Sequence, residues 1–211
     1  MPVTKPFRIG AAALMAVALW AEAGDYHSSG STNSTFLVAT TRHEEGPALM
    51  PADRAYIQSG TNRFSFLIPS GLKLVHSNYG NVSLVSQDYD CQIRFQIHTT
   101  EALPDDQLKP EWCWQKILRE HPEASMLCVV PAVADSRRGL AFQISFPGPG
   151  GSPRRGHVAF IPGRTGVFQF ELQSASTSFE ASLHQFNTVL LTFRASDESG
   201  QLQVSPLSDK L

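Results

Sequence analysis

The stretch "TSFEASLHQFNTVLLTFR", residues 177–194, places its apolar side chains on one side of a helix. Ser176 or Ser178 is a suitable N-cap, and Glu180 suits the first turn. The apolar positions recur with a period near 3.6, as an amphipathic helix requires: Phe179, Leu183, Phe186, Val189, Leu190 and Phe193. A helix with such an aromatic stripe must bury it against another layer, so this segment decides which fold is possible.

The residues that precede this helix predict the layer that it covers. Four apolar runs follow one another and are separated by short segments rich in Gly, Pro and Arg, as in an antiparallel meander. The runs are "SMLCVVPAVA" (125–134), "GLAFQISF" (139–146), "GHVAFIP" (156–162) and "VFQFELQS" (167–174).

The first half of the chain adds further strands and one helix. Strands are predicted in "RFSFLIP" (63–69), "LKLVHS" (72–77), "NVSLVSQ" (81–87) and "CQIRFQIHT" (91–99). The last of these alternates strictly, with Cys91 and Phe95 on a buried face and Arg94 and His98 on a wet face. A helix is predicted from Pro110 to about residue 120, where a His-Pro pair ends it.

This order of elements predicts an α+β fold. A mostly antiparallel sheet of about seven to eight strands carries two main helices, in an α/β/α arrangement. Composition divides the chain further. Residues 24–60 are rich in Ser, Thr and Gly and are predicted to be a flexible linker, in which "TFLVATT" is compatible with a short strand. Residues 61–195 form the domain, and 196–211 form a polar tail.

The first residues resemble a signal peptide. Lys5 and Arg8 precede twelve uncharged residues, 9–20, and Ala21-Glu22-Ala23 is a small-x-small cleavage site. The apolar run is shorter than the roughly 20 residues that a membrane-spanning helix needs. We therefore expect cleavage before Gly24, no membrane span afterwards, and a periplasmic or secreted protein.

Charge argues against nucleic-acid binding, since the chain has a formal net charge of −2 and no dense cluster of Lys and Arg. The basic residues pair only as Arg137-Arg138 and Arg154-Arg155, beside Gly and Pro. A solvated turn is one interpretation of each pair, and a small anion-binding or partner-binding patch is the other.

The closing segment "GHVAFIPGRTGVFQFELQSASTSFEASLHQFNTVLLTFR", residues 156–194, resembles the C-terminal unit of PsbP-like proteins. There, a hairpin and a polar bend lead into a helix that ends in a Phe-x-x-(V/I)-L-x-(T/S)-F phrase. The opening "RFSFLIPSGLKL" (63–74) is similar to the first hairpin of that family, and the resemblance covers about residues 61–195. It implies a binding or assembly-assisting module in place of a catalyst.

Cys113 lies between two tryptophans in "PEWCWQKIL" (110–118), and the sequence leaves two interpretations open. Helix and strand spacing could bring it beside Cys128, and a disulfide closing a loop of this size would contribute about 3 kcal/mol. The alternative is a reduced thiol in the core, as expected for Cys91. A reactive or metal-binding thiol is disfavoured because no Cys-x-x-Cys pair and no short-spaced ligand pair is present.

No sequence motif for catalysis, a cofactor or a metal emerges. Trp112 and Trp114 project from different sides of the predicted helix, so one of them is a candidate for partner contact, together with Arg154 and Arg155. We therefore expect an exported, non-catalytic accessory module whose partner is another envelope or secreted protein. The alternative is a small hydrolase or ligand-binding enzyme whose catalytic groups are scattered along the chain.

Overall fold

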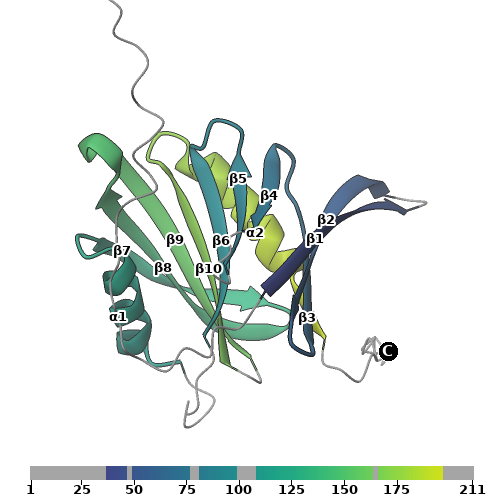
Figure 1. Cartoon of the computed structure of the whole chain (residues 1–211). Helices are drawn as coiled ribbons and strands as arrows, with labels where there is room; N and C mark the ends of the chain where they lie inside the picture. Colours follow the sequence, from purple (N-terminus) through teal and green to yellow (C-terminus); the bar gives the residue numbers. More distant parts are fainter. Residues whose placement is uncertain (1–36, 47–48, 77–80, 99–107, 164–165, 197–211) are drawn as a thin grey trace, which may run out of the picture. The chain divides into compact units, whose positions relative to one another are not determined.

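The computed structural model describes residues 37–46, 49–76, 81–98, 108–163 and 166–196 (Figure 1). The predicted signal peptide (1–23), residues 24–36 of the predicted linker, and residues 197–211 of the predicted tail lie outside this part of the chain. None of the helices among the described residues combines the length and apolar character that crossing a membrane requires.

The described residues form two antiparallel sheets and two α-helices. The smaller sheet has the order β1-β2-β3-β11, built from β1 (Leu37–Gly46), β2 (Leu49–Ser59), β3 (Asn62–Leu67) and β11 (Arg194–Ser196). The larger sheet has the order β4-β5-β6-β10-β9-β8-β7, built from β4 (Leu72–His76), β5 (Val82–Ser86), β6 (Cys91–His98), β7 (Ser125–Ala134), β8 (Arg137–Pro147), β9 (Pro153–Gly163) and β10 (Gly166–Ala175). The helices are α1 (Pro110–Glu120) and α2 (Phe179–Thr192), and a single 3-10 turn, η1 (Pro149–Gly151), joins β8 to β9. The α+β prediction is confirmed.

Helix α2 covers one face of the larger sheet with the aromatic stripe that the sequence predicts. Phe179, Phe186 and Phe193 are all 0% exposed. Phe193, directly after the helix, contacts rings from both sheets, with centroids 6.1 Å from Phe64 of β3 and 4.9 Å from Phe170 of β10. The stripe therefore holds the two sheets and α2 in one core.

Helix α1 packs on the opposite face of the larger sheet. Cys113 and Ile117 of the helix are buried against alternate residues of β8, β9 and β10, among them Phe142, Phe160 and Val167. The same strands can line the cores on both faces of the sheet, because neighbouring residues of a strand point to opposite faces. One strand thus supplies Phe142 to the α1 side and Ala141 to the α2 side.

Residues 37–46 and 49–59, which were expected to belong mostly to a flexible linker, form the strands β1 and β2, and β1 overlaps the short strand expected in "TFLVATT". They form a hairpin, and β2 continues the smaller sheet by pairing with β3. Among the side chains of β2 that the structure describes, Ala55 and Ile57 are the buried apolar ones, and Val38 of β1 is 49% exposed. Main-chain hydrogen bonds hold such a hairpin without an apolar pattern, so composition alone assigned it wrongly.

Candidate functional site

Polar side chains of β6 and β10 share the face of the sheet on which α1 lies. The register pairs Arg94 with Glu171, Gln96 with Gln169, and Gln92 with Gln173. Because residues opposite one another in an antiparallel pair point to the same side, these positions form a polar strip. The residues between them, such as Phe95 and Phe170, point into the core beneath α2. The wet face predicted for β6 is thus present, with its side chains half-buried.

The end of α1 adds two titratable groups to this strip. Glu120 is the last residue of the helix, and His121 is its C-cap, with its backbone N–H donating to the carbonyl of Ile117 at 2.8 Å. Pro122 follows, and a residue before proline is pushed out of the helical conformation. The helix therefore stops where its final carboxylate and the capping imidazole reach the sheet.

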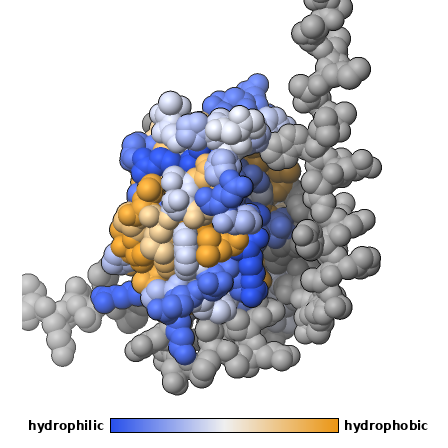
Figure 2. Space-filling view, turned by 90° about the vertical axis from the view of Figure 1, so that its left-hand side faces the viewer, coloured by the Kyte–Doolittle hydropathy of each residue, from blue (hydrophilic) through white to orange (hydrophobic). Residues whose placement is uncertain are grey.

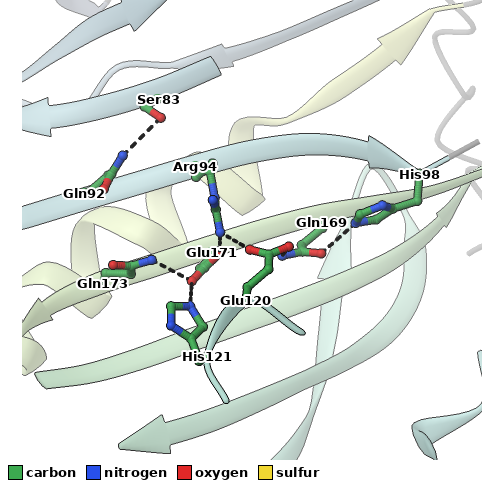
Figure 3. A network of polar contacts seen from close by, with 9 residues as sticks. All are labelled: Ser83, Gln92, Arg94, His98, Glu120, His121, Gln169, Glu171 and Gln173. Carbon is green, nitrogen blue, oxygen red and sulfur yellow. Dashed lines mark hydrogen bonds and ion pairs between the residues drawn. The ribbon is translucent and has the colours of Figure 1, made fainter. Parts of the chain in front are cut away.

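Glu171 is the centre of the resulting network (Figure 3). Its carboxylate is 1% exposed and accepts hydrogen bonds from three sides. The Arg94 guanidinium contacts both Glu171 and Glu120. His121 Nε2 lies 2.5 Å from Glu171 Oε1, and Gln173 Nε2 donates to the same oxygen at 2.8 Å. A buried carboxylate with this many donors is satisfied, and its ionised form is favoured.

The electrostatics of the network follow from burial and from these contacts. Burial raises the pKa of Glu171, but the hydrogen bond from His121 and the charge of Arg94 outweigh it and lower the pKa to about 2. Burial raises the pKa of Glu120, and the neighbouring charge of Glu171 adds to this, while Arg94 opposes it. Burial disfavours the charge of Arg94, but the two carboxylates more than compensate and raise its pKa. The three groups therefore form one cluster in which a single guanidinium is shared by two carboxylates.

At the other end of the strip, His98 joins the network through Gln169. His98 Nε2 lies 2.6 Å from Gln169 Oε1, and Gln169 Nε2 approaches Glu120 Oε1 at 3.5 Å. Burial lowers the pKa of His98; the hydrogen bond with Gln169 opposes this, and the charges of Lys116 and Arg94 add to the lowering. Trp112 closes this end by packing edge-on against His98, with ring centroids 6.0 Å apart.

Three groups of the network have donor atoms suited to a metal ion. Atoms of Glu120, His121 and Glu171 lie within 4.8 Å of one another. However, Arg94 already contacts both carboxylates and supplies the positive charge that a cation would bring. A metal ion would have to displace this guanidinium, so the geometry favours an ion-pair network over a metal centre.

Of the four predicted partner-contact residues, Trp112 touches this network, through its contact with His98, and the contacts of the other three lie elsewhere. Both tryptophans of α1 are half-buried and pack on the sheet: Trp112 lies edge-on to Phe160, and Trp114 stacks on Phe142. The two arginines are in β9 and not in a turn. Arg154 Nη2 donates to the carbonyl of Asp90 at 2.8 Å, and the Arg155 guanidinium lies 4.1 Å from the ring centroid of Phe179. All four have packing contacts, and their partner role stays a prediction.

The candidate disulfide between Cys113 and Cys128 is not formed. All three cysteines lie within the described residues and are free thiols. Cys113 is buried between α1 and the sheet, whereas Cys128 pairs with Gln143, whose side chain contacts Arg155 on the α2 side. The helix–strand spacing was compatible with a bridge, but β7 turns Cys128 to the opposite face of the sheet.

Sequence reasoning missed the three residues at the centre of the network: Glu120, His121 and Glu171. The available signal was the polar alternation of "QFELQ" (169–173), which matches that of "QIRFQIH" (92–98). Both runs were interpreted one strand at a time. Only the pairing of β6 with β10 puts an arginine opposite a glutamate.

Comparison with known proteins supports the fold and no more. No protein-family model matches the chain. No curated protein matches it in sequence either. Among solved structures, it is similar to the cyanobacterial PsbP (CyanoP) of Synechocystis, with a TM-score of 0.51 and 15% identity over 82% of this chain and 100% of that one. The predicted PsbP-like fold is thereby confirmed.

Two further solved structures match over similar lengths. The Ran-binding protein Mog1p of Saccharomyces cerevisiae has a TM-score of 0.47 and 12% identity, over 77% of this chain and 98% of that one. LpqN of Mycobacterium tuberculosis, which is involved in cell envelope biogenesis, has a TM-score of 0.43 and 13% identity, over 76% of this chain and 91% of that one.

Proposed function

We propose that this protein is an exported, non-catalytic binding module, and that the polar strip of β6 and β10 receives another envelope or secreted protein. The observation that carries the proposal is a row of polar side chains, held in place by a buried ion network, on a sheet face that α1 covers only in part. The apolar face of α1 packs on β8, β9 and β10, and the helices lie on opposite sides of the larger sheet (Figure 1).

Glu171, at the centre of the network, is suited to binding more than to chemistry. A general acid or base needs a pKa near the working pH and a free proton position, whereas the pKa of Glu171 is about 2 and its oxygens are occupied by donors. Burial raises the pKa of the Cys113 thiol to about 12, so this cysteine is not a nucleophile at neutral pH. These contacts weaken the alternative of a small hydrolase.

Fixed side chains suit recognition because little conformational entropy is lost when a partner binds. Arg94, Gln169 and Gln173 are each held by at least one hydrogen bond within the strip. Gln96 lies between Arg94 and His98 on the same face and is half-buried, and its side chain has no hydrogen bond to any other described residue. Its amide is therefore available to a partner at the centre of the strip.

The test is affinity capture from the exported fraction of the source cells, with a matched pair of glutamine variants. Gln96→Arg places a bulky cation in the strip, and Gln115→Arg places the same side chain on the exposed side of α1. We expect a specific partner to be captured by the wild type and by Gln115→Arg and to be lost with Gln96→Arg, provided that all three proteins unfold at similar temperatures. Capture of the same partner by both variants would refute the assignment to the strip. Failure of the wild type to capture any specific partner would refute the binding role.

A further inference from the structure

Strand β7 forms one edge of the seven-stranded sheet and is unusually apolar for an edge. None of its ten residues, "SMLCVVPAVA", is charged. Four large apolar side chains are exposed on it: Met126 at 43%, Leu127 at 51%, Val129 at 44% and Val133 at 51%. Edge strands are ordinarily protected by charged side chains, because an open apolar edge is a template for association. We call these four residues the β7 ledge.

The ledge continues the side of the sheet on which α1 lies. Met126 pairs with Ile144 and Val129 pairs with Phe142, and both partners belong to the core beneath α1. Figure 2 looks onto the side of the molecule that carries α1 and β7, and it shows hydrophobic residues gathered there between hydrophilic borders. An apolar surface of this kind, rimmed by polar residues, has the anatomy of an interaction site.

We propose that the β7 ledge is where two copies of this chain associate, with β7 of one copy antiparallel to β7 of the other. Charged residues near the two ends of β7 are the reason for choosing a second copy as the partner. Exposed Glu123 lies just before β7, and exposed Arg138 lies near the other end of β7, in the neighbouring strand β8 opposite Val133. A two-fold antiparallel arrangement places Glu123 of each copy beside Arg138 of the other, whereas a parallel arrangement brings like charges together.

Two features of β7 make this contact a closed dimer and not an extending sheet. Pro131 has no N–H to donate, and the register shift between Met126 and Cys128 interrupts the ladder. Side chains of the ledge, more than main-chain hydrogen bonds, therefore make the contact. A two-fold interface uses the same patch on both copies and closes at two. The opposite edge of the sheet, β4, differs because it carries the exposed charge of Lys73.

A single ten-residue strand edge belongs to the small class of interfaces, so the dimer forms at high concentration and dissociates on dilution. The measurement is the molar mass of the purified full chain by sedimentation velocity or light scattering at increasing concentration. We expect the mass to rise from that of the monomer toward twice that value.

Two valines provide a matched pair of variants. Val129→Lys puts a charge at the centre of the ledge and should keep the chain monomeric. Val75→Lys puts the same charge on β4, at a valine of similar exposure (48%), and should dimerise like the wild type. A charge exchange tests the orientation: Glu123→Lys should weaken the dimer by roughly threefold to tenfold, and adding Arg138→Glu should restore it.

Three outcomes would overturn the proposal. The wild type could remain monomeric at every concentration, or Val75→Lys could abolish the dimer as fully as Val129→Lys does. The third outcome concerns residues 197–211. This segment starts close in sequence to Ala195, and the Ala195 N–H donates to Asp135 in the turn after β7. If deleting them turns a monomer into a dimer, the occupant of the ledge is this tail and not a second copy. The Gln96→Arg capture experiment uses a different surface, so the two proposals fail separately.

Discussion

Replacing Glu171 by Gln tests whether the buried ion network stabilises the fold. The substitution keeps the shape of the side chain and removes its charge. Lowering the pKa of a carboxyl from 4.5 to about 2 on folding corresponds to about 3 kcal/mol of stability at neutral pH. Removing one partner of a buried ion pair costs about 3–5 kcal/mol in other proteins, which agrees with this magnitude. We therefore expect Glu171→Gln to lose about 3 kcal/mol in urea unfolding at pH 7.

The pH dependence of the same variant makes the test specific. Because the folded-state pKa of Glu171 lies below the unfolded value, its contribution is complete above pH 4.5 and is lost as the pH falls toward 2. The wild type should lose stability over this window, and Glu171→Gln should lack that part of the slope. Glu120 titrates together with Glu171, so the difference between the two curves reports the pair.

A surface glutamate supplies the control. The Glu180 side chain is 79% exposed and lies 3.4 Å from Arg155. Exposed ion pairs of this kind contribute between about 0 and 1 kcal/mol, so Glu180→Gln should change stability little at any pH. If Glu171→Gln costs no more than Glu180→Gln, or if both variants follow the wild-type pH profile, the stabilising role of the network is refuted.

Three further predictions concern the core and the thiols. Phe193→Ala should cost about 3–5 kcal/mol in urea unfolding, because it leaves a cavity among the aromatic rings where the two sheets meet. Leu191→Ala, at a side chain that is 70% exposed, should cost little. Equal losses of stability in the two variants would contradict the packing described above. Burial lowers the pKa of His157 to about 4, so lowering the pH from 6.5 to 4 should reduce the free energy of unfolding by up to about 3 kcal/mol, because the unfolded chain takes up a proton. If a His157→Leu variant shows the same loss, His157 is not its cause. A thiol reagent should modify Cys128 rapidly in the native protein and three thiols per chain after denaturation under non-reducing conditions; a count of one after denaturation would instead indicate a disulfide.

The periodicity of apolar side chains correctly predicted the strands and helices that bury one of their faces in the core. The alternation in "CQIRFQIH" gave β6 its correct faces, and the aromatic spacing of residues 179–193 gave α2 its buried side. Both predictions rest on side chains of a single element, where period and burial are coupled. The β1–β2 hairpin has no such coupling, because most of its described side chains lie outside the core.

The candidate site depended on pairings that the sequence does not display. Arg94 meets Glu171 only because β6 joins β10, which lies far along the chain, and because α1 ends where His121 can reach the same carboxylate. Of the two interpretations left open for Cys113, the structure has the reduced core thiol and not the disulfide, for a related reason. Distance along helix and strand was compatible with a bridge, but the face of the sheet on which Cys128 lies was not available from spacing.

The position of β10 also has a consequence for how the chain is made. β10 lies in the middle of the larger sheet, and Phe95 of β6 finds its neighbour Phe170 only 75 positions later. Closing so long a loop is slow, because its entropy is lost before the contacts form. During synthesis, the edge of β6 that pairs with β10 therefore stays open until most of the polypeptide has left the ribosome. Over that interval the nascent chain would depend on chaperones to shield its phenylalanines.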